Sequence, residues 1–382
     1  MVVELASTVA QKRLTLPQIS ICTNTTSKDK SCDTPAAFHW RRNLARPMPD
    51  QPFVSIIIPC YNEQATIRKL LEALRSQTYP SAKMEVIVSD GMSTDATREV
   101  IEVFQKEHDD LSVRVVMNQA RTIPSGVNQA IRESRGEIIV RLDAHSMPIP
   151  EYVERCVLAH QEGKGDNVGG VWEIRPGANT WVAESISFAA AHPLGVGDAM
   201  YRLNARPGAV DTVPFGSFRR SLIEKIGAFD ETLLANEDYE FNTRVRESGG
   251  VVWLDPSIRS VYFSRSTLGK LAVQYWRYGF WKFRMLKRYP HTLRWRQALP
   301  PAFVLILLTL IVLSLVWNAA GVLLALQLSF YLFALGLAGL QLAVKKRKGF
   351  LIWGLPLAIA VMHLAWGSAF LWSGLSSLFK NG

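Results

Sequence analysis

The stretch that decides the fold is Gly136–His145, with the sequence GEIIVRLDAH. Its apolar run, bounded by a glycine before it and by Met147-Pro148 after it, is typical of a parallel-sheet strand covered on both faces. In open α/β sheets ligands bind beyond the carboxyl ends of the strands, which is where Asp143 and His145 stand. Alternate residues of an extended segment point the same way, so these two side chains could face one ion.

A carboxylate and an imidazole at this spacing suit a hard divalent cation that is held partly by ligand phosphate, and Mg²⁺ or Mn²⁺ fits that description. The same residues also suit a simpler arrangement, in which Asp143 caps the next turn and His145 lies on the surface. The stretch by itself does not decide between a metal site and a turn.

Strand and helix patterns alternate on either side of this stretch. Such an alternation argues for a parallel sheet with right-handed crossovers. There is no GxGxxG and no GxxxxGK[ST] motif, which argues against a classical dinucleotide fold and against a P-loop. The expected strands are Phe53–Ile58, Met84–Ser89, Val113–Met117 and the opening stretch, and the expected helices are Glu63–Gln77, Thr94–His108 and Pro124–Ser134.

Polar residues follow the ends of three expected strands. Tyr61 and Glu63 follow the first, Asp90 follows the second, and Asp143 and His145 follow the fourth. Exposed loops are polar in general, but three acids at three strand ends favour a shared nucleotide site.

The net charge of +10 is distributed unevenly over the 382 residues. Asp255 is the last acidic residue, and all later charged side chains are Lys or Arg, so the part of the chain before them is net acidic. The basic balance therefore belongs to the C-terminal part, and we expect no nucleic-acid partner. The four cysteines show no CxxC pair and no zinc spacing, which favours a reducing compartment.

Two further segments carry polar residues of interest. Asn236–Phe241 opens an expected helix with a capping Asn and acids in its first turn, which ordinary helix capping would also explain. Gly195–Pro207, which includes Arg202, is interpreted as a mobile loop on the acceptor side, and we assign no chemistry within it.

Several motifs, in this order, resemble the GT-A domain of glycosyltransferase family 2. They are VSIIIPCYNE at Val54–Glu63, VSDG at Val88–Gly91, LDAH at Leu142–His145, GAFDE at Gly227–Glu231, NED at Asn236–Asp238 and QYWRY at Gln274–Tyr278. The resemblance covers roughly residues 52–290. Within the family, the chain is most similar to the succinoglycan-type glucosyltransferases of bacterial exopolysaccharide assembly.

This resemblance implies a site for a nucleotide-sugar donor. The usual second acid of the family's Asp-x-Asp motif is His145 here, which still permits metal binding through a neutral imidazole. The implied nucleotide contacts are Pro59, Tyr61 and Glu63 in the pocket wall, Asp90 at the base, Asn128 near the nucleotide sugar and Asp143 at the ribose or metal.

The resemblance also implies the catalytic groups. It places the base of an inverting transferase at Asp238, with Glu237 beside it. Such a base is needed because a sugar hydroxyl must lose its proton as it attacks the anomeric carbon. Gln274 and Arg277 match the family's Gln-x-x-Arg-aromatic motif, in which the guanidinium helps to hold the leaving diphosphate.

The C-terminal part has the composition of a membrane anchor. Residues 266–289 interleave aromatic with basic side chains, as in an amphipathic helix at the headgroups of an anionic leaflet. Ala302–Trp317, Gly321–Val344 and Leu351–Trp372 are three apolar runs that could span a membrane. The positive residues before the first run and at Lys345–Lys348 place the catalytic domain in the cytoplasm and the C-terminus outside, in a multi-pass protein of the inner (plasma) membrane.

We therefore predict an α/β protein in four parts. These are an irregular N-terminal extension at 1–50, a Rossmann-like GT-A domain at 51–263, a basic aromatic interfacial segment at 264–299 and a membrane domain of about three transmembrane helices at 300–382.

The predicted function is that of a membrane-anchored inverting glycosyltransferase. It would transfer a sugar, glucose from UDP-glucose in our interpretation, to a polyprenyl-linked acceptor in bacterial polysaccharide biosynthesis. The alternatives are a processive polysaccharide synthase, a nucleotidyltransferase on a similar sheet and a non-catalytic nucleotide-binding membrane scaffold.

Overall fold

The computed structural model describes residues 51–203 and 206–379, so the predicted N-terminal extension lies outside the described residues. The first half of the fold is a parallel sheet in the order β3-β2-β1-β4. Its strands are β1 Val54–Cys60, β2 Met84–Asp90, β3 Ser112–Met117 and β4 Ile138–Arg141, joined by the helices α1 Ile67–Arg75, α2 Thr97–Glu107 and α3 Ile123–Glu133. The predicted parallel sheet is confirmed, and the strand of the opening stretch is buried throughout.

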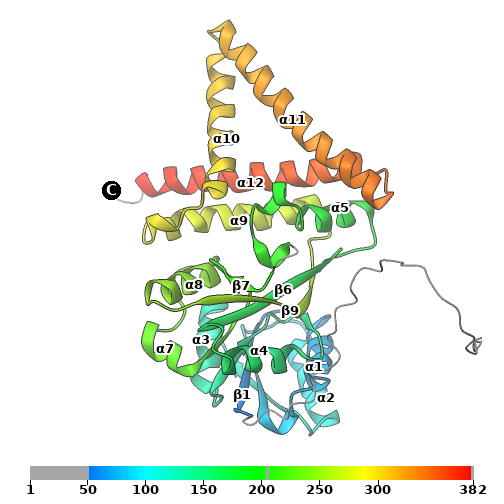
Figure 1. The fold of residues 1–382 in the computed structure, drawn as a ribbon, viewed down its shortest axis with the longest axis vertical. Helices are drawn as coiled ribbons and strands as arrows, with labels where there is room; N and C mark the ends of the chain where they lie inside the picture. The colour runs from blue at the N-terminus through cyan, green and yellow to red at the C-terminus, as the bar shows by residue number, and fades with distance from the viewer. Residues whose placement is uncertain (1–50, 204–205, 380–382) are drawn as a thin grey trace, which may run out of the picture. The chain divides into compact units, whose positions relative to one another are not determined.

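The sheet continues beyond β4 with strands of mixed direction, of which Figure 1 labels β6, β7 and β9. β8 pairs antiparallel with both β4 and β6, and β6 pairs parallel with β9, which completes a nine-stranded sheet among the described residues. The added strands are β5 Met147–Pro148, β6 Asn167–Arg175, β7 Gly208–Ala209, β8 Ser217–Arg219 and β9 Val252–Phe263, and the helices in this half are α4 Tyr152–Gln161, α5 Trp181–Ala189, α6 Pro193–Val196, α7 Arg220–Ile226 and α8 Glu237–Glu247.

Helix α1 begins four residues later than predicted, because the segment from Glu63 to Thr66 forms a turn. The backbone N–H groups of Thr66 and Ile67 both donate to the carbonyl of Glu63, at 3.0 and 2.9 Å. Asn62, just before this turn, has a positive φ of 54°. The turn leaves the Glu63 side chain at the carboxyl end of β1, where it belongs to the site described below.

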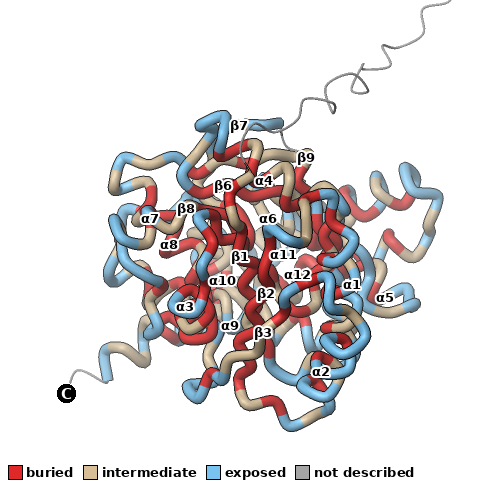
Figure 2. The backbone as a smooth tube through the Cα atoms, turned by 90° about the horizontal axis from the view of Figure 1, so that it is seen from below, coloured by how far each residue is buried: buried red, intermediate tan, exposed pale blue. Residues whose placement is uncertain are grey.

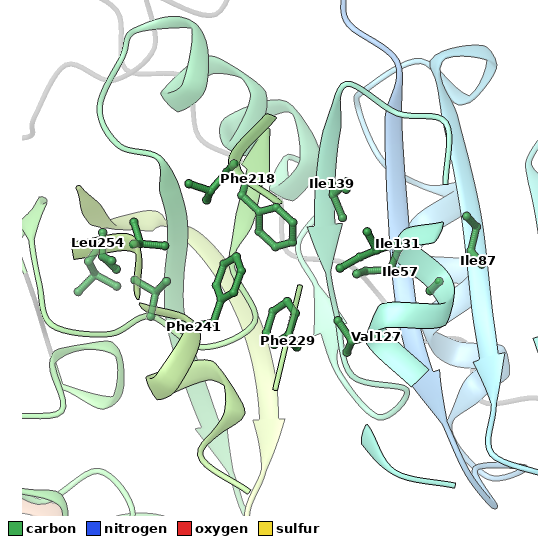
Figure 3. Packing of buried hydrophobic residues seen from close by; sticks show 14 residues of the cluster. Ile57, Ile87, Val127, Ile131, Ile139, Phe218, Phe229, Phe241 and Leu254 are labelled. Carbon is green, nitrogen blue, oxygen red and sulfur yellow. The ribbon is translucent and has the colours of Figure 1, made fainter. Parts of the chain in front are cut away.

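The core of the domain packs β1, β2 and β4 against α3 and α8 (Figures 2 and 3). Three phenylalanines hold α8 in place: Phe229 stacks on Phe241 with ring centroids 4.3 Å apart, and Phe218 of β8 lies 5.1 Å from Phe241. Because burial of large aromatic side chains contributes strongly to stability, this cluster fixes the start of α8 beside the end of β4.

The C-terminal part consists of four long helices, α9 Leu268–Leu286, α10 Trp295–Leu313, α11 Asn318–Lys346 and α12 Leu351–Phe379. The last three are long and apolar enough to cross a membrane, by length and composition. The predicted apolar helices are therefore confirmed, but the first begins earlier than expected, at Trp295, and contains Pro300 and Pro301 inside the helix. The predicted domain limits within the chain stay a prediction.

Strands β6 and β9 approach most closely at a bulge in their pairing, between Gly169 and Val171. A Cβ atom added at Gly170 would lie 1.9 Å from the backbone oxygen of Ile258, whereas one added at Gly208 of β7 would meet open space. The absence of a side chain at Gly170 is therefore a condition for joining the two strands.

We expect Gly170→Ala to lower the free energy of unfolding by about 1–3 kcal/mol or more, because the backbone must move to relieve the overlap. Gly208→Ala is the matched control and should leave stability nearly unchanged. Thermal unfolding of the purified proteins in detergent measures both, and equal midpoints for the two variants would contradict the proposed crowding.

Candidate active site

The centre of the candidate site is the buried guanidinium of Arg141, at the carboxyl end of β4. It donates to Glu237 Oε1 at 3.0 Å, forms a close ion pair with Asp238 Oδ1 and lies 3.6 Å from Asp143 Oδ1. The structure thus brings Asp143 together with Glu237 and Asp238, which lie almost a hundred residues away in the sequence. Sequence reasoning missed Arg141, although a charged residue inside an apolar strand run was a usable signal.

One cation facing three carboxylates leaves this cluster with an excess of negative charge. Burial raises the pKa of Asp238 above its ordinary value, and the charges of Glu237 and Asp143 act in the same direction, whereas Arg141 opposes them. A carboxylate with a raised pKa is a stronger base, which suits proton abstraction near neutral pH. Arg141 binds Oδ1 of Asp238, and the backbone N–H of Phe215 also donates to this carboxylate, so both fix its orientation.

Asp143 and His145 fit a divalent cation. Asp143 Oδ1 is buried without a hydrogen-bond partner. His145 Nδ1 lies 3.0 Å from Glu63 Oε1, so the carboxylate accepts its proton and the Nε2 lone pair stays available for a metal. The described residues contain no group of three or more His, Cys, Asp or Glu that could hold a metal, so ligand oxygens would have to complete the coordination.

The pairing with Glu63 is also visible in the titration of His145. Burial lowers the pKa of His145, but the hydrogen bond to Glu63 and the charge of Asp143 outweigh burial and raise it above its ordinary value. For Glu63, burial raises the pKa, but the hydrogen bonds from His145 and Thr66 outweigh it and lower the pKa. Acid would therefore protonate His145 early and compete with a metal.

The other predicted nucleotide contacts lie at the neighbouring strand ends. Tyr61 is half exposed, and its side chain lies over Gly91. Asp90 is fully buried and accepts a hydrogen bond from the backbone N–H of Ser93 at 3.1 Å, so its carboxylate holds its own loop. The nucleotide roles of Pro59, Tyr61 and Asp90 stay predictions.

Asn128 of α3 uses its whole amide within the protein. Its Nδ2 donates to the backbone oxygen of Phe229 and to Glu231 Oε1, both at 2.8 Å, and its Oδ1 accepts from the N–H of Phe229 at 2.9 Å. Asn128 therefore fixes the segment that precedes α8, and its place near the nucleotide sugar stays a prediction.

A cavity of about 1230 Å³ connects the carboxylate cluster to the apolar helices. At one end Asp143 and Asp238 line it, and at the other Phe330 of α11 and Trp366 of α12 do so. This cavity also contains the predicted diphosphate residues. Gln274 Nε2 donates to the hydroxyls of Tyr262 and Tyr278 at 3.0 Å each, and Arg277 Nη2 donates to the carbonyl of Leu234 at 2.8 Å.

Arg202 lines the same cavity, although sequence reasoning assigned it no chemistry. Its guanidinium lies 4.8 Å from the ring centroid of Trp172, which stacks on Tyr262 at 4.2 Å. Arg202 also makes a side-chain hydrogen bond with Tyr275, and the indole nitrogen of Trp172 is buried without a partner. The pair therefore places a positive charge and an indole N–H without a partner at the wall of the cavity. A lone arginine in a loop carries no sequence pattern that would have revealed this.

Comparison with known proteins identifies the type of fold and domain. Residues 55–227 match the family model described as Glycosyl transferase family 2. The chain is 28% identical over 318 residues to a dolichyl N-acetyl-alpha-D-glucosaminyl phosphate 3-beta-D-2,3-diacetamido-2,3-dideoxy-beta-D-glucuronosyltransferase of Methanococcus voltae, with 81% of this chain and 94% of that protein covered. It is 29% identical over 322 residues to the succinoglycan biosynthesis protein ExoA of Rhizobium meliloti, with 82% and 93% covered.

A solved structure confirms the predicted GT-A architecture. The mannosyltransferase PcManGT from Pyrobaculum calidifontis, in complex with GDP-Man and Mn²⁺, superimposes with a TM-score of 0.59 at 21% identity. The match covers 85% of this chain and 88% of that one.

We expect Arg141→Gln to lower the free energy of unfolding by about 3–5 kcal/mol, because it leaves Glu237 and Asp238 buried without their cation. The control is Arg219→Gln, which removes a more exposed pair with Glu137 and should cost about 1 kcal/mol or less. Thermal unfolding of the two variants measures this difference. Equal shifts of their unfolding midpoints would mean that the Arg141 cluster contributes no more to stability than a surface ion pair.

Proposed function

Because this chain is a glycosyltransferase that carries a family 2 domain, we propose that it transfers a sugar from a nucleotide donor to a lipid-linked acceptor at a membrane surface. The observation that supports this proposal is the single cavity that joins the carboxylate cluster to α10, α11 and α12. A soluble acceptor would need no apolar wall of this size. The relatives named above act, by their names, on a dolichyl-linked sugar phosphate and in succinoglycan biosynthesis.

In the proposed reaction, Asp238 is the base of an inverting transfer. Its carboxylate takes the proton of the acceptor hydroxyl while the hydroxyl oxygen attacks the anomeric carbon of the donor, glucose of UDP-glucose in our proposal. The bond from the anomeric carbon to the diphosphate breaks, and the nucleoside diphosphate leaves with the electron pair. Arg141 orients Asp238, and its charge opposes the rise in the pKa of Asp238 that burial causes.

The leaving diphosphate carries charge that the site must stabilise. Arg277 faces it from α9, and Arg202 faces it, or the phosphate of the acceptor, from the loop before β7. A Mg²⁺ or Mn²⁺ ion held by Asp143 and His145 would neutralise part of the same charge. The surplus of carboxylates around Arg141 favours such an ion.

We place the protein in the plasma membrane with the catalytic domain on the cytoplasmic side. Support comes from the distribution of charge, since all charged residues after Asp255 are basic and Lys345–Lys348 returns to the side of the catalytic domain. Incubating membranes with a panel of radiolabelled nucleotide sugars and analysing the lipid extract tests the function. Label that enters no lipid from any donor would reject it.

We expect Asp238→Asn to reduce turnover by roughly 10²–10⁴-fold, because the amide cannot accept the hydroxyl proton. Donor binding, measured by calorimetry with UDP, should stay close to that of the wild type. Glu247→Gln changes an exposed carboxylate on the same helix and should leave turnover unchanged. Wild-type turnover in the Asp238 variant would reject the assigned base.

We expect Asp143→Ala to weaken the Mn²⁺-dependent part of UDP binding by at least about tenfold, because it removes the carboxylate whose buried oxygen accepts no hydrogen bond. Asp110→Ala, which removes an exposed partner of Arg75, is the control. UDP affinities that follow the same curve across a Mn²⁺ titration in both variants would rule out Asp143 as a metal ligand.

A further inference from the structure

Helix α12 has the length and hydropathy of a membrane span, but it lies along the catalytic part of the protein for most of its length. Near its start, a Cβ added at Gly354 would lie 2.1 Å from the hydroxyl of Ser185 in α5. Near its end, the ring of Phe370 lies 5.2 Å from that of Phe283 in α9. Figure 1 shows α12 running beside α9, with α10 and α11 leaving from its other side.

The contact between α9 and α12 is close in the middle as well. A Cβ at Gly279 of α9 would lie 2.2 Å from the backbone oxygen of Trp366, so only glycine permits this approach of the two helices. Leu271 and Tyr275 of α9 share a buried cluster with Leu355 and Met362 of α12. Two helices in contact over this length share one orientation relative to the membrane.

A neighbouring face of α9 rests on the catalytic domain. Asn236 Nδ2 donates to the backbone oxygen of Tyr278 at 3.2 Å, and the ammonium of Lys282 lies 3.7 Å from the ring centroid of Tyr239 in α8. α9 also carries Lys270, Arg277 and Arg284. A basic residue at the centre of a spanning helix costs about 2.5–3.5 kcal/mol, so a helix with these residues and these contacts lies at the surface.

Helices α10 and α11 behave differently. The buried side chains of α10 are Pro301 and Val304, which lie no further along than its midpoint, and most of those of α11 lie between Leu335 and Ala343 towards its end. Large apolar side chains between these points, such as Val316 and Phe330, are more than three-quarters exposed. The hairpin of α10 and α11 therefore projects away from the rest of the protein (Figure 1). The 19 residues of α10 reach about 28 Å, close to the hydrocarbon thickness of a bilayer.

We infer that α12 lies in the plane of the membrane, embedded in the interface layer above α9, and that the chain crosses the bilayer only through α10 and α11. The C-terminus is then on the same side as the catalytic domain, and not opposite to it. The surface that α12 offers to lipid is the row of large apolar side chains that the protein leaves exposed, namely Trp353, Leu357, Leu364, Trp372, Leu375 and Phe379. This inference does not depend on the proposed reaction.

An α12 in this position forms a wall of the cavity at the level of the headgroups. Its His363 donates through Nε2 to the carbonyl of Leu194 at 2.7 Å and accepts through Nδ1 from the hydroxyl of Tyr331 at 3.1 Å. Met362 and Trp366 line the cavity on either side of this histidine. The in-plane helix thus connects the loop beside the site to the spanning hairpin.

The sidedness of two single substitutions tests the number of crossings. Asn318→Cys places a thiol at the first residue of α11, next to the turn that follows α10, and Gly382→Cys places one at the C-terminus. In intact cells we expect a membrane-impermeant maleimide to label Asn318→Cys only, and in permeabilised cells to label both. Wild type supplies the background, and Gly349→Cys should match the C-terminal variant. Labelling of Gly382→Cys, or protection of Asn318→Cys, in intact cells would overturn the inference.

The depth of α12 gives a second measurement. Spin labels at Leu357, Leu364 and Leu375, in full-length protein with its native cysteines replaced by alanine, should show the same depth in lipid vesicles by collision with oxygen and a polar nickel complex. A spanning α12 would separate the first and last labels by about 27 Å along the membrane normal. A steady change of depth through the three positions would contradict an in-plane helix.

Discussion

The ion cluster around Arg141 is the interaction on which the site depends. A buried guanidinium is stable only when its charge is matched, and the matching carboxylates come from the first turn of α8, which folds far from β4 in the sequence. The stacked rings of Phe229 and Phe241 bring α8 to that place, and Asn128 fixes the segment before it. The hydrophobic core therefore sets the position of α8 relative to β4, and this position allows Arg141 to pair with the carboxylates of α8.

The local pattern of the sequence predicted the parallel half of the sheet and the strand end where Asp143 and His145 stand, because apolar runs and polar strand ends are local properties. It predicted Glu237 and Asp238 only through resemblance to a family. The link between these residues is Arg141, whose partners are set by tertiary packing and leave no periodic trace in the sequence. The turn after β1 was missed for a similar reason: the backbone of Glu63 is held by Thr97 of α2, which no local pattern shows.

The membrane part shows a different limit. A hydropathy window measures whether a helix of given length would be stable in lipid, and α10, α11 and α12 all satisfy that condition. The window does not measure how the helix is oriented relative to the membrane. That orientation is decided by the contacts that the helix makes along its whole length. The glycines at 279 and 354 let α12 lie against α9 and α5, and glycine is compatible with spanning and in-plane helices alike.

The distribution of charge along the cavity connects these parts. At the sheet end, Arg141 faces more carboxylates than it can neutralise, so that end favours a cation. Further along, the guanidinium of Arg202 lies among aromatic rings, so that region carries a positive charge that suits an anion. At the helix end, Phe330 and Trp366 favour an apolar chain. A cavity that favours a metal, a phosphate and a lipid tail in this order suits the transfer of a sugar onto a lipid-linked acceptor. A cavity for two soluble substrates would need only the regions for the metal and the phosphate.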